Sequence, residues 1–207
     1  MFRKSLKKAA EFHGHVCPGL AMGVRVAELA LKDFISGKAE DEEVLCIVEN
    51  DSCAVDAVQA LTGCTFGKGN LLFRDYGKQA YTFIKRPPGN SKKGEAIRIS
   101  VIWVSPEETV REKEMWKRYM EGDHSPEVLE AVHKRKSKKI KAMLEASEED
   151  LFTLKRFKTK PPCEARIFQS VACTKCGEKT METRTKMFYG RVLCQPCFEK
   201  EMDVCKR

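Results

Sequence analysis

The chain has 207 residues, which is enough for one well-packed domain and a small second one. Its first residues are strongly basic and lack the apolar segment of a secretory signal, and the most apolar run, near residues 97–104, is only as long as a strand. We therefore expect a cytoplasmic protein with no membrane segment, whose ten cysteines are not a disulfide framework.

The N-terminal third of the chain predicts three helices and one strand. A proline in the first turn marks the start of the second helix, and a glycine closes the third. The strand is a continuous apolar run of the kind that is buried on both faces. The helices are expected at residues 1–12, 18–33 and 54–61, and the strand at residues 43–49.

Four further strands and two long helices are predicted over the rest of the first domain. The strands are expected at residues 71–74, 79–86, 95–104 and 152–157, and the helices at residues 107–121 and 126–146. Helices gathered against a largely antiparallel sheet make an α+β core, which we place at residues 1–158. The prolines after Lys160 mark a linker to a small domain at residues 163–207.

The net charge of +8 makes nucleic acid a partner to consider. The densest basic run, residues 133–141, lies in the second of the two long helices. A solvated helix face is the preferred interpretation of this run, and a site for a polyanion or a protein partner is the alternative.

A loop with two histidines and one cysteine precedes the second helix. His13, His15 and Cys17 are soft ligands within five positions, a pattern that suits a transition-metal site or an activated nucleophile. The positive end of the helix should favour the thiolate form of Cys17. In the alternative, the histidines bond backbone carbonyls and Cys17 packs as a small apolar group.

The third helix carries a second group of candidate residues. Cys53, Asp56 and Gln59 are spaced by three and share one helix face, and Cys64 lies just past the helix end. Cys53 also follows a buried strand, the place where clefts of α/β proteins collect ligands. Both cysteines could instead be core thiols, as we expect for Cys46 inside its apolar strand.

A glycine-rich loop follows at residues 63–70. It lacks the spacing of a Walker phosphate loop, so we interpret it as an active-site loop that tolerates anions. Lys68 and Asn70 in this loop, with Lys78 after the next strand, are the candidates for binding a small anionic substrate or cofactor. A plain surface turn is the alternative for the segment around Lys78.

Two CxxC pairs stand near the C-terminus. Cys173 and Cys176 form the first pair and Cys194 and Cys197 the second, with a spacer that fits a four-cysteine zinc site. Each pair brings two sulfurs to one tetrahedral centre, so we predict a structural zinc ion that organises a small ribbon. Two disulfides or four buried thiols are the alternative.

With these motifs in view, the chain resembles the family of the formylmethanofuran dehydrogenase E-subunit. The resemblance spans about residues 6–145 and rests on residues 13–20 with Gly23 and Arg25, on residues 53–59 and on residues 62–70. The C-terminal cysteine pairs resemble a TraR/DksA-type zinc ribbon. The family implies an α+β core, commonly paired as a homodimer, in which the histidine loop and the later cysteines approach one another in a cleft.

The leading hypothesis is a metal-dependent protein of one-carbon or anaerobic redox metabolism. A zinc or other transition-metal ion would be held in the core cleft by His13, His15, Cys17 and Cys53. The candidate catalytic residues are Cys17, Cys53, Asp56, Cys64 and Lys68, with Asp56 as a base or as the residue that orients a metal ligand. The sequence leaves open whether the chain is an enzyme.

Two other functions remain as alternatives. One is an accessory or assembly factor whose zinc ribbon and basic helix dock on a larger enzyme. The family's association with a molybdenum or tungsten enzyme that reduces carbon dioxide to formylmethanofuran makes such an enzyme the candidate partner. The other is a nucleic-acid reader, which is less favoured because only Phe188 and Tyr189 lie between the cysteine pairs, too few aromatic residues for a stacking platform.

Overall fold

The computed structural model describes residues 2–87 and 92–205. The chain forms two compact units, Met1–Glu164 and Ala165–Arg207. We had placed the end of the first domain at 158, but the first unit extends further because Arg86 holds the following segment. Arg86 Nη1 donates to the carbonyl of Pro162 at 2.7 Å, and its Nε lies 3.8 Å from a carboxylate oxygen of Glu164.

The first unit contains six helices and five strands in its described residues, and the α+β prediction is confirmed. The helices are α1 (Phe2–His13), α2 (Pro18–Asp33), α3 (Ala54–Thr62), α4 (Val110–Met120), α5 (Pro126–Glu145) and α6 (Glu148–Leu151). The strands are β1 (Val44–Val48), β2 (Leu71–Phe73), β3 (Ala80–Lys85), β4 (Gly94–Val101) and β5 (Phe152–Thr159). They form one sheet in the order β2-β1-β3-β4-β5, in which only β1 and β2 pair in parallel.

Local signals explain where most of these helices begin and end. The Cys17 side chain caps α2, and Gly63 ends α3 in the left-handed conformation at φ 78°. Helix α4 begins at 110 rather than at the expected 107, because Thr109 and Glu112 form a reciprocal capping box.

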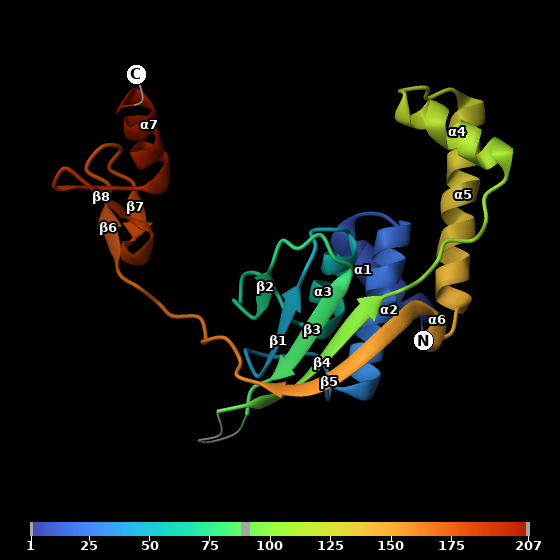
Figure 1. The fold of residues 1–207 in the computed structure, drawn as a ribbon, viewed down its shortest axis with the longest axis horizontal. Coiled ribbons are helices and arrows are strands. Elements are labelled where there is room, and N and C mark those ends of the chain that lie inside the picture. The colour runs from blue at the N-terminus through green and yellow to red at the C-terminus, as the bar shows by residue number, and fades with distance from the viewer. Residues whose placement is uncertain (1, 88–91, 206–207) are drawn as a thin grey trace. The chain divides into compact units, whose positions relative to one another are not determined.

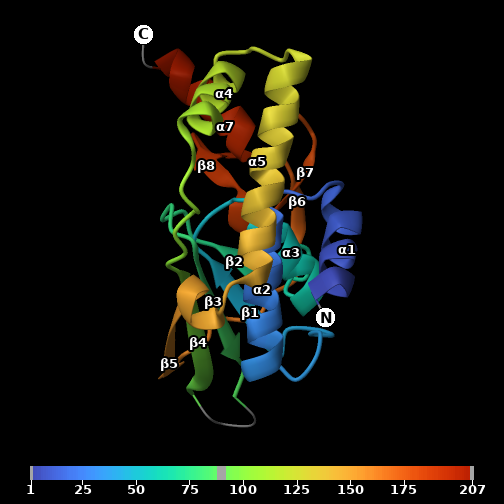
Figure 2. The ribbon, with the colours of Figure 1, turned by 90° about the vertical axis from the view of Figure 1, so that its right-hand side faces the viewer.

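The helices α2 and α3 cover one face of the sheet, and α1 packs against both of them (Figures 1 and 2). Alternate side chains of the central strands point into this layer, among them Tyr81, Phe83, Ile97 and Ile99, all of them fully buried. Cys46 is fully buried in the same cluster. The sequence pattern of the strands therefore places the main core between the sheet and α2.

The crossing of α2 and α3 depends on Gly23. A Cβ atom at this position would lie 2.3 Å from the carbonyl oxygen of Ala54, a distance that no real Cβ contact tolerates. Gly19, one turn earlier, faces Cys53 in the same way, with 3.2 Å between its ideal Cβ and the Cβ of Cys53. Two glycines one turn apart thus bring the N-terminal ends of α2 and α3 together.

Helices α4 and α5 form a hairpin with its own small apolar cluster around Met115, Val128 and Val132. In Figure 1 this hairpin extends away from the sheet. At the other end of α5, the buried Arg25 donates to the carbonyls of Met143 and Ala146 at 2.7 and 2.8 Å. Burial lowers the pKa of this guanidinium, although nearby carboxylates oppose the shift.

The basic run of α5 is largely neutralised by acidic side chains. Arg135 and Lys139 both bind the carboxylate of Glu108, at 2.8 and 2.7 Å, and Lys138 lies 3.2 Å from Glu112. The pKa of Glu108 is lowered by the hydrogen bond from Lys139 first and by Arg135 after it. These contacts agree with the preferred interpretation of a solvated, paired helix face.

The second unit consists of two short hairpins and a helix in its described residues. The elements are β6 (Ser170–Ala172), β7 (Lys179–Met181), the 3-10 helix Glu182–Arg184, β8 (Lys186–Phe188), β9 (Arg191–Leu193) and α7 (Gln195–Cys205). Its core is Leu193 and three buried cysteines, with Phe188 and Phe198 beside them. Within residues 2–87 and 92–205, no helix combines the length and the apolar character needed to cross a bilayer.

Candidate metal centres

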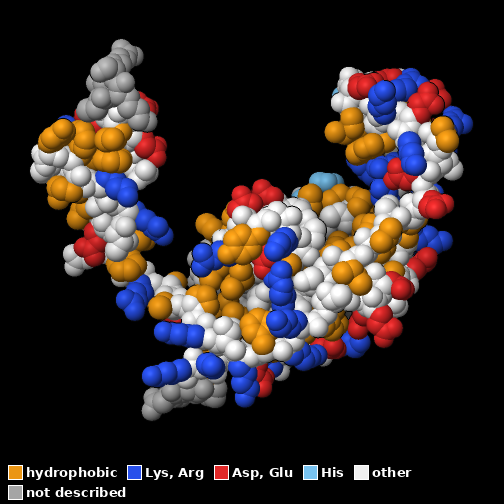
Figure 3. Space-filling view, viewed as in Figure 1, with side chains coloured by type: hydrophobic (Ala, Val, Ile, Leu, Met, Phe, Trp, Pro, Cys, Tyr) orange, Lys and Arg blue, Asp and Glu red, His pale blue; other side chains and the backbone are white. Residues whose placement is uncertain are grey.

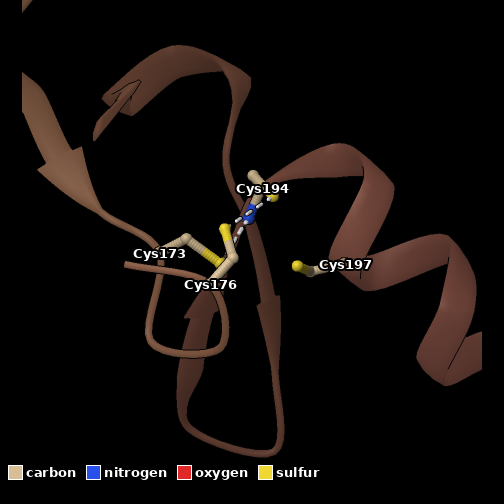
Figure 4. A group of neighbouring side chains, drawn as sticks. All are labelled: Cys173, Cys176, Cys194 and Cys197. Atoms are coloured by element: carbon tan, nitrogen blue, oxygen red, sulfur yellow. Dashed lines mark hydrogen bonds between the residues drawn. The ribbon is translucent and has the colours of Figure 1, made fainter. Parts of the chain in front are cut away.

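The four C-terminal cysteines converge on one point (Figure 4). The sulfurs of Cys173, Cys176, Cys194 and Cys197 all lie within 4.8 Å of one another. Cys173 and Cys176 flank a tight turn closed by the bond from Gly177 N–H to the Cys173 carbonyl at 2.9 Å. Cys194 and Cys197 stand at the end of β9 and in the first turn of α7. Four thiols in this arrangement fit a closed tetrahedral zinc site.

The backbone prepares part of this site for negative charge. The N–H of Cys194 donates to the sulfur of Cys173 at 3.3 Å. Backbone N–H groups of Cys176 and Cys194 lower the pKa of Cys173 to about 6, whereas the neighbouring sulfur of Cys194 and burial raise that of Cys197 to about 12. Packing four sulfurs together therefore favours one thiolate at the expense of another, unless a cation compensates the charge.

The first unit holds a second group of candidate ligands. The ligand atoms of His13, His15 and Cys17 lie within 4.8 Å of one another. His13 is the last residue of α1, and Gly14 turns the chain at φ 94°, so that the two imidazole centroids lie 4.6 Å apart. His15 is exposed, and Figure 3 shows histidine surface on this unit beside hydrophobic surface.

One hydrogen bond fixes the orientation of the His13 ring. Its Nδ1 lies 2.7 Å from Oδ2 of Asp56 on α3. A carboxylate only accepts, so the proton is on Nδ1 and the lone pair of the neutral ring is on Nε2. That Nε2 is buried and has no hydrogen-bond partner among the described residues. A carboxylate behind the histidine and a free, buried nitrogen in front of it are what a metal-binding histidine needs.

Cys53 and Cys17 meet because the two helix ends meet. Cys53 is the residue before α3, and its pKa is raised by burial first and then by its hydrogen bond and charge interaction with Cys17. The sulfur of Cys17 accepts from the N–H of Leu20 at 3.3 Å, as expected at a helix start. Cys53 thus lies beside the His13, His15 and Cys17 group without belonging to the tight cluster.

The remaining sequence candidates have other contacts. Cys64 is fully buried, with its sulfur 3.6 Å from the Val44 carbonyl and its pKa raised by burial to about 11. Lys68 Nζ donates to the carbonyls of Ala39 and Glu40 at 2.9 and 3.2 Å. These bonds hold the loop before β1 and give Lys68 a structural role.

Asn70 and Lys78 also differ in their surroundings. Asn70 is fully buried, and its amide joins the carbonyls of Asp41 and Val44, each at 2.9 Å. The side chain of Lys78 is exposed, while its carbonyl accepts from Asn50 at 2.9 Å. Asn70 therefore fastens loops together, and neither residue lies beside the histidine group.

Sequence reasoning missed a cavity next to this group. It has a volume of 410 Å³ and is lined by His13, Cys53 and Asp56 together with side chains from β1, β2 and their loops, including Asn50, Phe66, Leu71 and Phe73. The parallel pairing of β1 with β2 puts the ends of both strands on one side of α3. No local pattern announces this pairing, although the two exposed phenylalanines, Phe66 and Phe73, are a signal that the sequence does contain.

With this geometry established, we compared the chain with known proteins. Residues 12–153 match the family model described as "FmdE, Molybdenum formylmethanofuran dehydrogenase operon". The chain belongs to the FmdE family. The resemblance drawn from the sequence is thereby confirmed, and the histidine group, Cys53 and Asp56 all lie inside the matched FmdE segment.

A curated relative and a solved structure extend the comparison. A protein of Archaeoglobus fulgidus described as "Probable S-adenosyl-L-methionine-binding protein" is 36% identical over 195 residues, which cover 87% of this chain and 50% of that protein. The chain thus spans about half the length of this relative. The crystal structure of an FmdE-like protein of the tungsten formylmethanofuran dehydrogenase type from Syntrophus aciditrophicus aligns with a TM-score of 0.61 and 24% identity, over 96% of this chain and 92% of that one. This second similarity is one of fold.

Proposed function

We propose that this FmdE-family chain is a metal-dependent protein of one-carbon or anaerobic redox metabolism, with its working ion in the first unit. The observation that carries the proposal is the His13 ring, tied through Nδ1 to Asp56 at 2.7 Å and left with a buried, unbonded Nε2 within reach of His15 and Cys17. Such a nitrogen is costly to bury without a partner. A metal ion provides that partner.

The donor set suits zinc or a similar borderline metal. His13, His15 and Cys17 supply two imidazoles and a thiol, with Cys53 as an additional sulfur. Three protein ligands leave a coordination position for water or substrate, and a bound zinc ion would act there as a Lewis acid. In this arrangement Asp56 orients His13, and the N–H of Leu20 stabilises the Cys17 thiolate.

Metal analysis of the full chain, purified without oxygen, tests the proposal. We expect close to two ions per chain, one on the four cysteines of the ribbon and one on the histidine group. A Cys17→Ala/Cys53→Ala double variant should retain about one ion and remain folded by circular dichroism. A folded double variant with the same metal content as the wild type would contradict the core site.

Dimerisation of the first unit is part of the same proposal. Large apolar side chains are exposed on α4 and α5, among them Val110 at 85% and Met120 at 66% exposure, and such surface favours association. Light scattering of the full chain should give the mass of two chains, and Val110→Asp/Met120→Asp should give one. The matched control is Met187→Asp, at an equally exposed methionine of the second unit. A monomeric wild-type chain would contradict the proposal.

An accessory role is the second candidate function. The ribbon is a separate compact unit, and it exposes Ile167, Met187 and Tyr189. We propose that these side chains dock on a larger enzyme, with a molybdenum or tungsten formylmethanofuran dehydrogenase as the candidate. Full-length bait should retain that enzyme in a pull-down, and Met187→Ala/Tyr189→Ala bait should not. Equal retention by both baits would contradict docking through the ribbon.

The relative from Archaeoglobus fulgidus suggests one specific ligand to test. Its printed description names S-adenosyl-L-methionine, and this chain matches half of that protein. Calorimetric titration of S-adenosyl-L-methionine into the full chain measures whether the matched half is sufficient for binding. Absence of heat would assign that property to the other half of the relative.

A further inference from the structure

The cavity beside the histidine group has the volume of a small-molecule site. Its 410 Å³ falls within the range of about 300–1,000 Å³ that such sites occupy. It lies where the parallel strands β1 and β2 end, beside the start of α3, which is the usual position for a ligand in an open sheet. Three residues of the candidate metal centre, His13, Cys53 and Asp56, form part of its lining.

The walls of the cavity are mainly apolar and partly aromatic. Val48 and Leu71 contribute buried side chains, and Phe66 and Phe73 stand at 76% and 46% exposure. Figure 3 shows hydrophobic side chains grouped over the β2 edge of the sheet. A mostly exposed phenylalanine gains nothing from water, so a hydrophobic occupant would be stabilised against it.

The position of Phe66 is fixed by hydrogen bonds on both sides of its loop. Its N–H donates to Oε1 of Gln59 at 3.1 Å, and the N–H of Thr65 donates to Oδ1 of the buried Asn70 at 2.8 Å. Gln59 is in turn bonded to Asp56, 3.3 Å from Nε2 to Oδ1. The aromatic wall is therefore preorganised, and it is connected through Gln59 to the carboxylate that holds His13.

The charges around the cavity exclude one class of ligand. Its described lining contains the carboxylates of Asp51 and Asp56 and no lysine or arginine. Lys68, the basic residue expected here, is bonded to the carbonyls of Ala39 and Glu40 instead. A phosphate or carboxylate would meet negative groups without a compensating cation.

We propose that this cavity binds a planar aromatic group without negative charge, placed between Phe66 and the apolar strand ends, with the reacting end of the ligand toward His13 and Cys53. The inference rests on the proposed metal centre for the reacting end only. The aromatic wall is a property of Phe66, Leu71 and Phe73 and can be measured without any metal.

Cobalt-substituted full chain provides the first test, because its visible spectrum responds when a ligand enters an open position, whereas a four-thiolate site has none. The probes are imidazole and phenylimidazole. We expect phenylimidazole to bind at least about 10-fold tighter, from burial of its ring, and a carboxylate on that ring to cancel the gain. Phe66→Ala should bring the two affinities together. Tyr76→Ala, at an exposed aromatic residue outside the cavity lining, should leave the ratio unchanged.

A metal-free measurement separates the two proposals. The uncharged naphthalene fluorophore Prodan should bind the full chain about 10-fold more weakly after Phe66→Ala and equally well after Tyr76→Ala. Equal Prodan binding by all three proteins would overturn the aromatic site, whatever the cobalt spectrum shows. Normal Prodan behaviour with no spectral response to either imidazole would leave the aromatic site in place and overturn the metal centre. A change of oligomeric state in Phe66→Ala would assign the wall to a protein contact and overturn the ligand proposal.

Discussion

The two candidate metal centres differ in what the protein gains from an ion. In the ribbon, three of the four buried core residues are themselves cysteine ligands, and only Leu193 remains without them. The histidine group, by contrast, is attached to helices that already pack on an extensive core with Tyr81, Phe83 and Ile97 at its centre. A metal that holds a fold together has its coordination filled by the protein, while a metal added to a finished fold is free to bind something else.

The sharpest way to break this comparison is to remove a ribbon ligand. Cys173→Ser should release one ion and unfold the second unit, because so small a core depends on metal binding, which contributes on the order of 10 kcal/mol to such modules. Limited proteolysis should then cut after residue 164 and leave the first unit intact. Cys163→Ser, at an exposed cysteine outside both clusters, is the control. A Cys173→Ser chain that resisted proteolysis as the wild type does would show that the ribbon folds without its metal.

Overpacking the helix crossing should have the next largest effect. A methyl group at Gly23 meets the Ala54 backbone at 2.3 Å, so Gly23→Ala should destabilise the first unit by about 1–3 kcal/mol or more, measured by denaturant unfolding. It should also weaken the core metal site by separating Cys17 from Cys53. Gly67→Ala, where nothing lies within 4 Å, should unfold as the wild type does.

Removing a histidine ligand sharpens the comparison in the opposite direction. His13→Ala should lose the core ion and keep the ribbon ion, with a free energy of unfolding lower by only about 1 kcal/mol, since its ring packs outside the main core. Metal analysis and urea unfolding check both parts. His133→Ala, at an exposed histidine of α5, should change neither. Global unfolding of His13→Ala would mean that the core metal is structural too.

The smallest effect is expected at Asp56. Asp56→Asn keeps the shape of the side chain and removes the negative charge behind His13, so the core metal affinity should fall about 10–100-fold while the fold is unaffected. Competition with a chelator measures the affinity. Asp51→Asn, a second carboxylate of the cavity without a hydrogen bond to His13, is the matched control. Equal affinities for wild type and Asp56→Asn would assign Asp56 a purely structural role.

Local sequence signals were sufficient for most of the fold. Pro18 and Gly63 mark the ends of α2 and α3, and the apolar run at β1 is buried as its composition implies. The pairing of β1 with β2 in parallel could not be read, because both strands are short and their register is set by contacts across the fold. Helix α6 has only four residues and was missed.

The candidate site was predictable in its ligands and less so in its surroundings. His13, His15 and Cys17 are close in sequence, so their proximity needed no tertiary information. The contact of Cys17 with Cys53 depends on a close helix crossing, for which Gly23 was the available signal. Lys68 illustrates the limit: a lysine in a glycine-rich loop looks ready for an anion, and only the fold reveals the two carbonyls that it binds.

Arg25 has a consequence for how the first unit is made. The last carbonyls of a helix need partners, and α5 takes its partner from a side chain 118 residues earlier rather than from a glycine of its own. Contacts of such long range are slow to form, because a large loop must close before they contribute. During synthesis, α2 therefore emerges long before the helix end that it completes. The histidine loop next to α2 reaches its final support only when nearly the whole first unit has left the ribosome.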